Sequence, residues 1–317
     1  MSDLPISSEA LNAGLFKLRF KALGTDCEVQ FRGPSVETAK AFRAEGLQWI
    51  RNFEKTWSRF KPDSLICKIN QAAGKHTIAL TPAQDQIIQL CQYSYDTTEG
   101  LLDPSSLPLT DLWDRASQIN QIPTDLEISE VLSLIGWEKI EYQPGKIYLP
   151  RKGMALEIGG FGKEYAADKL IAIAQQHGID SALVDLGRDL ATLGSPPHGD
   201  YWVLGIEDAQ NANEPLLRIG LAGEALATSG NGRRFRTIAG KRFGHIINVQ
   251  SGFPADNDVL TATGLAPDCL TAGLLSTTAC IEGSLENIHR HFRIEAIVQT
   301  NKEIRYSQNI HRHILPN

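Results

Sequence analysis

Hydrophobic and polar positions first alternate along the chain and then change to a helical spacing. Residues 15–32 alternate apolar and polar side chains on both sides of Gly24, which predicts two strands or one bent strand. Apolar residues then recur at roughly helical spacing through residues 35–60, which predicts a helix. A second helix is expected to begin at Thr81, a capping residue followed by proline, and to end near Gly100.

Beyond Gly100 the pattern predicts groups of strands with helices between the groups. The expected elements are a helix over 127–135, a hairpin over 138–149, a strand over 154–160, a helix over 161–178, strands over 181–187, 201–206 and 216–222, a helix over 267–281 and a closing strand pair around 301–302. Because helices do not follow every strand, this order favours an α+β fold over a doubly wound one. Since no repeat or low-complexity linker divides the chain, we treat residues 1–317 as a single unit.

Composition excludes several classes of protein. The chain has 317 residues, of which 42% are hydrophobic, enough for one large or two ordinary domains. Its 31 basic and 37 acidic residues are well mixed, so we expect no nucleic-acid partner. Five cysteines without CxxC spacing argue against a disulfide framework and a structural zinc site. We see no signal peptide and no transmembrane run, and we expect a cytoplasmic protein.

A glycine-rich junction between an expected strand and an expected helix is the first candidate for chemistry. Gly159, Gly160 and Gly162 let the backbone approach a ligand closely, and the following helix start offers N–H groups to an anion. Lys163 adds a positive charge. The spacing matches neither GxGxxG nor a P-loop, and a purely structural turn would use the same glycines.

Two further candidates lie at the ends of expected strands. Asp189 follows a buried strand and could accept hydrogen bonds from a ligand, although an exposed turn aspartate would give the same pattern. The turn Thr228-Ser229-Gly230 places two hydroxyls and a glycine just before a basic cluster. That cluster is typical either of an anion site or of a solvated hairpin, and it consists of Arg233, Arg234, Arg236, Lys241 and Arg242.

His245 and Asp268 complete the set of candidates. His245 lies between the basic cluster and an apolar stretch that predicts a buried strand, so it is either a core histidine or a titratable group of a site. Asp268 lies in the first turn of an apolar helix, where aspartate commonly caps the helix. The same carboxylate could instead bind Mg²⁺, which usually takes only one or two protein carboxylates together with ligand phosphates.

Eight segments in a fixed order carry a resemblance to a known family. They are LGT at 23–25, WSRFKPDSLICKIN at 57–70, the stretch from LLDPSSLPL to LWD over 101–114, IGGFGKEYAAD at 158–168, LVDLGRDL at 183–190, ATSG at 227–230, GHIINVQSGFP at 244–254, and the helix start at Asp268. Each segment alone is weakly specific. Together, over about residues 18–283, they resemble the ApbE family of flavin transferases, the FAD:protein FMN transferases.

The resemblance implies a two-lobed, T-fold-related α+β architecture with mixed or antiparallel sheets and flanking helices. It implies an FAD site between the lobes and Mg²⁺ at the pyrophosphate. Members of the family move FMN from FAD, their substrate, onto a Thr or Ser hydroxyl of an acceptor protein and release AMP. This reaction is a phosphoryl transfer, in which catalysis consists mainly of positioning and charge neutralisation.

Residue roles follow from the same resemblance. Asp268 would bind Mg²⁺ through its side chain and Gly162 through its carbonyl, and His245 would take the proton from the attacking hydroxyl. Lys163 would steady the glycine turn or face the phosphates. The pyrophosphate would lie near the turn, and the residues expected around FAD are Asn70, Gly159, Gly160, Asp189, Thr228, Ser229 and Gly230.

The chain departs from the family pattern at several of these positions. Glu164 follows Lys163 where the family has glycine, and Ala272 lacks the usual hydroxyl four residues after Asp268. The other departures are Arg188, Asn248, Val249 and Ser251. A flavin transferase is therefore the leading hypothesis, and two alternatives stay open: an FAD diphosphatase that forms FMN and AMP with water, and a catalytically impaired flavin-binding or scaffold protein.

Overall fold

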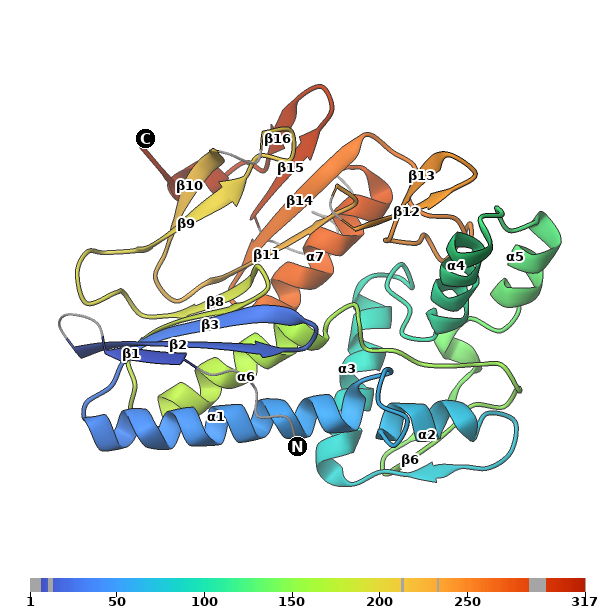
Figure 1. Cartoon of the computed structure of the whole chain (residues 1–317), viewed down its shortest axis with the longest axis horizontal. Helices are drawn as coiled ribbons and strands as arrows, with labels where there is room; N and C mark the ends of the chain where they lie inside the picture. Colours follow the sequence, from blue (N-terminus) through green and yellow to red (C-terminus); the bar gives the residue numbers. More distant parts are fainter. Residues whose placement is uncertain (1–6, 11–13, 212–213, 233, 285–294, 317) are drawn as a thin grey trace.

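A long antiparallel sheet runs through the computed structural model, which describes residues 7–10, 14–211, 214–232, 234–284 and 295–316 (Figure 1). Every adjacent pair of its strands is antiparallel. In spatial order the strands are β1 (Ser7–Ala10), β2 (Leu15–Ala22), β3 (Thr25–Arg32), β7 (Ser181–Leu186), β8 (Asp189–Leu193), β11 (Ala225–Gly230), β14 (Val259–Ala266), β15 (Glu295–Thr300) and β16 (Ile304–Tyr306). The predicted α+β class with antiparallel sheets is confirmed.

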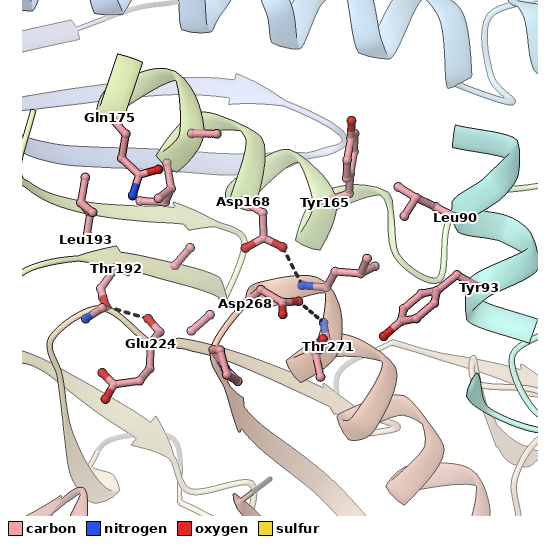
Figure 2. A pocket seen from close by; sticks show the side chains of 17 residues that line it. Leu90, Tyr93, Tyr165, Asp168, Gln175, Thr192, Leu193, Glu224, Asp268 and Thr271 are labelled. Carbon is pink, nitrogen blue, oxygen red and sulfur yellow. Dashed lines mark hydrogen bonds between the residues drawn. The ribbon is translucent and has the colours of Figure 1, made fainter. Parts of the chain in front are cut away.

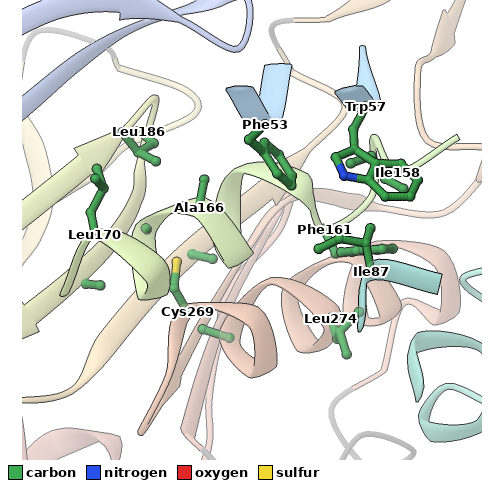
Figure 3. Packing of buried hydrophobic residues seen from close by; sticks show 14 of the residues in the cluster. Phe53, Trp57, Ile87, Ile158, Phe161, Ala166, Leu170, Leu186, Cys269 and Leu274 are labelled. Carbon is green, nitrogen blue, oxygen red and sulfur yellow. The ribbon is translucent and has the colours of Figure 1, made fainter. Parts of the chain in front are cut away.

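Three helices pack with this sheet and enclose the main core. They are α1 (Val36–Trp57), α6 (Gly162–Gln176) and α7 (Cys269–Glu282). Helix α7 packs on β8, β11 and β14, α6 packs on β7 and β8, and α1 contacts α6 and β2. The buried side chains between them include Phe53, Leu170 and Leu274 (Figure 3). Helix α7 is apolar on nearly all sides because the sheet and α6 both contact it.

A small three-stranded sheet packs against the long sheet through a second cluster of apolar side chains. It consists of β9 (Trp202–Glu207), β10 (Pro215–Leu221) and β17 (Ile314–Leu315). Apolar side chains such as Ile219 pack against Leu226 and Leu265 of β11 and β14 in a second core cluster. Strands β11 and β14 are thus fixed by apolar contacts of their own, in addition to their packing with α7.

The remaining elements are α2 (Leu65–Gln71), α3 (Pro82–Thr97), α4 (Leu107–Ile119), α5 (Asp125–Leu132), the 3₁₀ turn Trp137–Lys139, the strands β4 (Ile78–Ala79), β5 (Glu141–Gln143) and β6 (Lys146–Tyr148), and the hairpin β12 (Phe235–Ile238) and β13 (Lys241–Gly244). Of these elements, α2 and α3 lie near one end of α1, and α4, α5 and the β12–β13 hairpin lie further from it (Figure 1). A last 3₁₀ turn spans Ile310–Arg312. Within the described ranges, no helix has both the length and the apolar character needed to cross a membrane.

Several local predictions are confirmed with their physical cause. Ser35 caps α1 by accepting a hydrogen bond from the N–H of Thr38. Thr81 and Gln84 form a reciprocal capping box at the start of α3. The strands β2 and β3 turn at Leu23 and Gly24, both of which have positive φ, so the glycine break does separate two strands.

The predicted strand over 154–160 is wrong. The segment is extended, but it joins no sheet, because other groups take its backbone hydrogen bonds. The side-chain amide of Asn70 bonds both the N–H and the carbonyl of Leu156, and the N–H of Glu157 donates to the carbonyl of Pro104. An apolar run therefore became a buried loop that leads into α6.

The strand predicted after His245 is also wrong, and helices α2 and α4 had no counterpart in the sequence prediction. Strand β13 ends at Gly244, and Ile247 forms only an isolated bridge with Pro254. The indole N–H of Trp113, on α4, donates to the carbonyl of Gly252 at 2.9 Å. This bond and apolar packing fix residues 245–254 against α4 and α5 without a sheet.

Candidate active site

The turn before α6 exposes backbone to an incoming ligand. Gly159 and Gly160 are exposed, whereas Gly162, the first residue of α6, is buried against Ile158. Phe161 holds the N-cap position and its side chain makes no capping hydrogen bond. The N–H of Gly162 donates to the carbonyl of Ile158. The helix start still carries a partial positive charge, which favours an anion.

Asn70 holds the loop that leads to this turn. Its Nδ2 donates to the carbonyl of Leu156 at 2.9 Å, and its Oδ1 accepts from the N–H of Leu156 at 2.7 Å. Both ends of the amide are therefore engaged with the backbone. Asn70 therefore fixes the backbone of the segment before Gly159. It is also one of the residues expected around FAD.

A half-buried glutamate next to the turn, Glu157, belongs to an ion-pair network. Glu157 lies 3.3 Å from the guanidinium of Arg59 and accepts a hydrogen bond from Thr110 at 2.9 Å. Burial raises the pKa of Glu157, and Arg59 partly opposes that rise. Arg59 also approaches Asp111 at 3.5 Å. This network joins α4 and the loop after α1 to the glycine turn.

Lys163 and Asp189 form an ion pair between the start of α6 and the start of β8. Asp189 is only 3% exposed. Burial alone would lower the pKa of Lys163, but Glu164 and Asp189 outweigh burial and raise it, so the ammonium stays charged. Burial and the neighbouring Glu164 raise the pKa of Asp189, and Lys163 partly opposes them. The ammonium of Lys163 is thus the positive charge next to two buried carboxylates, those of Asp189 and Glu164.

The turn Thr228-Ser229-Gly230 ends β11, and its side chains face protein groups. The hydroxyl of Ser229 lies 2.8 Å from those of Ser276 and Thr277 on α7. The hydroxyl of Thr228 lies 2.9 Å from that of Thr263 on β14. A Cβ at Gly230 would lie 2.5 Å from the carbonyl of Leu260, so glycine is required there by close packing.

His245 is partly buried and held in one tautomer. Its Nδ1 lies 3.1 Å from the carbonyl of Arg234. A carbonyl only accepts, so Nδ1 carries the proton and Nε2 keeps its lone pair. Burial, together with the charges of Arg234, Arg236 and Lys163, lowers the pKa of His245 to about 4, although the hydrogen bond to the Arg234 carbonyl partly opposes this. The ring is therefore neutral near pH 7, as a general base must be.

The basic cluster around His245 separates in the structure. Arg236 pairs with Asp114 on α4 at 2.7 Å, and its Nη1 is buried without a hydrogen-bond partner among the described residues. Arg242 stacks on the ring of Phe235 at 3.8 Å. Arg233 lies outside the described residues. Arg242 thus belongs to the exposed hairpin, whereas Arg236 is held against α4 by Asp114.

Asp268 caps α7 at a different place (Figure 2). Its carboxylate accepts the N–H of Thr271 at 2.8 Å, and Asp168 of α6 accepts those of Cys269 and Leu270 at 2.7 and 2.9 Å. Burial raises the pKa of Asp168 to about 6, the two N–H groups oppose that rise and Asp268 adds to it. Both carboxylates line a cavity of about 570 Å³ that none of the other predicted site residues lines.

Gly162 and Asp268, the two residues expected to hold Mg²⁺, lie at the starts of α6 and α7. Asp168, whose carboxylate meets α7 beside Asp268, lies six residues after Gly162, or about 9 Å along α6. Across the residues with described positions, no group of three or more His, Cys, Asp or Glu side chains has the arrangement of a metal site.

Sequence reasoning missed three residues that shape this region. Glu164 is buried beside the Lys163–Asp189 pair, Glu157 holds Arg59 next to the turn, and Asp168 shares the capping of α7. A usable signal existed for Glu164, because it lies at a buried position of α6, where an acidic side chain is rare.

Comparison with known proteins gives one consistent family. The model of the ApbE family matches residues 23–298. A FAD:protein FMN transferase of Treponema pallidum (strain Nichols) is 26% identical over 280 residues, which are 82% of this chain and 77% of that protein. A FAD:protein FMN transferase of Escherichia coli (strain K12) is 25% identical over 275 residues, covering 84% and 78%.

Solved structures show the same fold. The ApbE protein from Thermotoga maritima superposes with a TM-score of 0.85 at 23% identity, covering 95% of this chain and 100% of that one. The flavin transferase ApbE from Vibrio cholerae superposes with a TM-score of 0.83 at 21% identity, covering 97% and 100%. Since the family model also spans most of the sequence, the chain belongs to the ApbE family.

Proposed function

We propose that this chain is a flavin transferase that moves FMN from FAD onto a hydroxyl of an acceptor protein. Family membership and the activity named for its relatives support the reaction class. The observation that carries the proposal is His245, a neutral imidazole whose Nδ1 holds the proton, so that Nε2 keeps its lone pair. A neutral base, a helix start and an ammonium beside that start are groups that phosphoryl transfer needs.

The proposed step uses groups of this chain. The FAD pyrophosphate binds at Gly159 and Gly160, where the helix start and Lys163 offset its charge. Nε2 of His245 takes the proton of a Thr or Ser hydroxyl as its oxygen attacks the phosphorus of the FMN half. The bond from that phosphorus to the bridging oxygen breaks, and AMP leaves with that oxygen. The products are a phosphoester-linked FMN and AMP.

Mg²⁺ is a further part of the proposal, because a bound divalent cation would neutralise charge on the pyrophosphate. The residues expected to hold it are Gly162 and Asp268, and one oxygen of the Asp268 carboxylate already accepts the N–H of Thr271. No step above passes through the metal. A cytoplasmic location is also proposed, and it is supported by five cysteines that are all free thiols within the described residues.

The experiment separates transfer from its alternatives. The protein is incubated with FAD and Mg²⁺, with and without a candidate acceptor, and AMP, free FMN and acceptor mass are measured. A transferase releases AMP in step with an acceptor that gains FMN. A diphosphatase releases AMP and free FMN without an acceptor. FAD binding with no AMP under either condition would overturn both enzyme activities and leave a flavin-binding protein.

A further inference from the structure

The β12–β13 hairpin carries positive charge in a chain that is acidic overall. Residues 225–255 contain no Asp or Glu and all five members of the basic cluster, whereas the whole chain has a net charge of −6. Arg234, Lys241 and Arg242 are exposed and form no ion pair with any of the described residues. Cations gathered on one element without counter-charges produce a local positive potential, which attracts an acidic partner.

The two faces of this hairpin differ. Neighbouring side chains of a strand point to opposite faces, so Phe235 and Thr237 share one face of β12. Both residues are exposed. On the other face, Ile238 is buried in the core cluster around α4, and Arg236 pairs with Asp114 of α4. The hairpin therefore packs on α4 with one face (Figure 1), and the face of Phe235 and Thr237 is open to solvent.

An aromatic ring and a guanidinium are in contact on the open face. Arg242 is paired with Thr237 in the register of the hairpin, and paired side chains lie on the same face. Its Cζ lies 3.8 Å from the centre of the Phe235 ring, and its guanidinium also donates to the carbonyl of Gly232. These contacts hold Arg242 in place, and Phe235 is still 46% exposed. Aromatic and arginine side chains are enriched among the residues that dominate the affinity of protein interfaces.

The open face begins beside the proposed base. Nδ1 of His245 lies 3.1 Å from the carbonyl of Arg234, the residue before Phe235, and Gly244 pairs with Phe235 across the hairpin. An acceptor whose hydroxyl reaches Nε2 of His245 must therefore lie close to Arg234 and Phe235. Lys241 begins β13 four residues before His245, or about 13 Å along the strand, so the positive charge extends from the base to the tip of the hairpin.

We propose that the open face of the β12–β13 hairpin is the docking surface for the acceptor protein, and that it fits an acceptor with acidic residues near the Thr or Ser that receives FMN. The docking surface consists of Phe235, Thr237 and Arg242, with Arg234 and Lys241 at its two ends. This inference rests on the proposed function, because only a transferase has an acceptor to bind. An anionic membrane would also be attracted by exposed cations, but the contact of Arg234 with His245 favours the acceptor.

The test measures the binding of an acidic probe. The probe is a fluorescein-labelled peptide with a central Thr flanked by Asp and Glu, and its control peptide has Asn and Gln at the same places. Fluorescence anisotropy follows each peptide while full-length protein with saturating FAD is added. We expect the acidic peptide to bind more tightly, and added salt to remove most of the difference, because salt screens exposed charges.

Variants locate the binding on the hairpin. The double variant Lys241→Gln with Arg242→Gln, and separately Phe235→Ala, should weaken binding of the acidic peptide at least ~5-fold, as truncation of an important interface residue does. The matched control removes two exposed cations of α1, which lies away from the hairpin (Figure 1), in Lys40→Gln with Arg51→Gln. It should change binding less than about 2-fold, because distant exposed charges are screened. Melting temperatures check that each variant is folded.

Three results would count against the inference. Equal affinity for the two peptides, or equal losses in the hairpin and α1 variants, would overturn it. Binding to phosphatidylserine vesicles that the hairpin variants abolish, without selective peptide binding, would assign the surface to a membrane instead. FAD fluorescence, measured without peptide, separates the two levels. FAD binding without selective peptide binding removes this inference alone, whereas no FAD binding removes the proposed function too.

Discussion

The ammonium of Lys163 on α6 pairs with the carboxylate of Asp189 on β8, two elements that lie side by side although 26 residues separate the pair. Asp189 is 3% exposed, and no water shell can replace its partner. The pair therefore fixes the glycine turn to the sheet, and it also places a cation next to the turn where we propose that FAD binds.

Removing that cation should destabilise the protein. Lys163→Met leaves Asp189 and Glu164 buried without a counter-charge, and breaking such a pair typically costs about 3–5 kcal/mol. Urea unfolding followed by circular dichroism measures the loss. The double variant Lys163→Met with Asp189→Asn should recover part of it, because one unpaired charge is gone. A loss below about 1 kcal/mol in the single variant would contradict a buried, interacting pair.

Replacing Asn70 should loosen the loop before the turn. Asn70→Ala leaves the N–H and the carbonyl of Leu156 without partners, and each unsatisfied buried group costs about 1–3 kcal/mol. We expect lower stability together with weaker FAD binding, because the loop leads directly to Gly159. Fluorescence titration of FAD at a temperature where both proteins are folded checks the second effect. Unchanged FAD affinity would restrict Asn70 to a structural role.

The protonation of His245 should affect stability in a defined pH window. Burial lowers its pKa from 6.5 to about 4. Between these values the unfolded chain binds a proton that the folded chain does not, so stability falls as pH falls from about 6.5 towards 4. Over that pH window, the free energy of unfolding of the wild type should fall by about 2–3 kcal/mol more than that of His245→Gln.

The comparison with His245→Gln is needed because Asp168 acts in the opposite direction. Its pKa is raised to about 6, so its contribution to stability grows as pH falls from about 6 towards 4. Asp168 is present in both proteins and cancels in the difference. Urea unfolding at pH 7.5 and pH 4.5 gives that difference. Parallel pH dependence in the two proteins would show that His245 is not buried as a neutral ring.

Asp268 should behave as a helix cap. Asp268→Ala removes the bond to the N–H of Thr271 and should cost about 1 kcal/mol, whereas Asp268→Asn should stay close to wild type because Asn caps almost as well. Thermal unfolding of the two variants measures the contrast. Equal destabilisation by Ala and Asn would show that the negative charge of Asp268, and not its hydrogen bond, is what matters.

Local signals in the sequence predicted much of the fold. Ser35 and Thr81 have the residue types that cap helices, and alternation around Gly24 predicted the β2–β3 pair. The loop over 154–160 could not be predicted in this way. Its apolar pattern suits a strand, but Asn70, 86 residues away from Leu156 in sequence, and the carbonyl of Pro104 take the place of a sheet partner. Such long-range replacement of hydrogen bonds leaves no local periodicity.

The candidate site shows the same limit. The sequence predicted a helix start directly after the glycine turn, and in the structure α6 begins there with Gly159 and Gly160 exposed. The sequence did not predict that Glu164 is buried beside the Lys163–Asp189 pair. That burial depends on how α6 and α7 pack, because Gly273 of α7 leaves room for the Glu164 side chain.

The most direct test of the account is the mass of an acceptor protein after incubation with FAD, compared between wild type and His245→Gln. FAD affinity is measured in parallel to show that the variant still binds its substrate. We predict that the wild type adds one FMN to a Thr or Ser of the acceptor and that the variant does so ~10²–10⁴-fold more slowly, because it lacks the general base. Equal rates of FMN addition by the two proteins, or no covalent flavin on any acceptor despite FAD binding, would contradict the account.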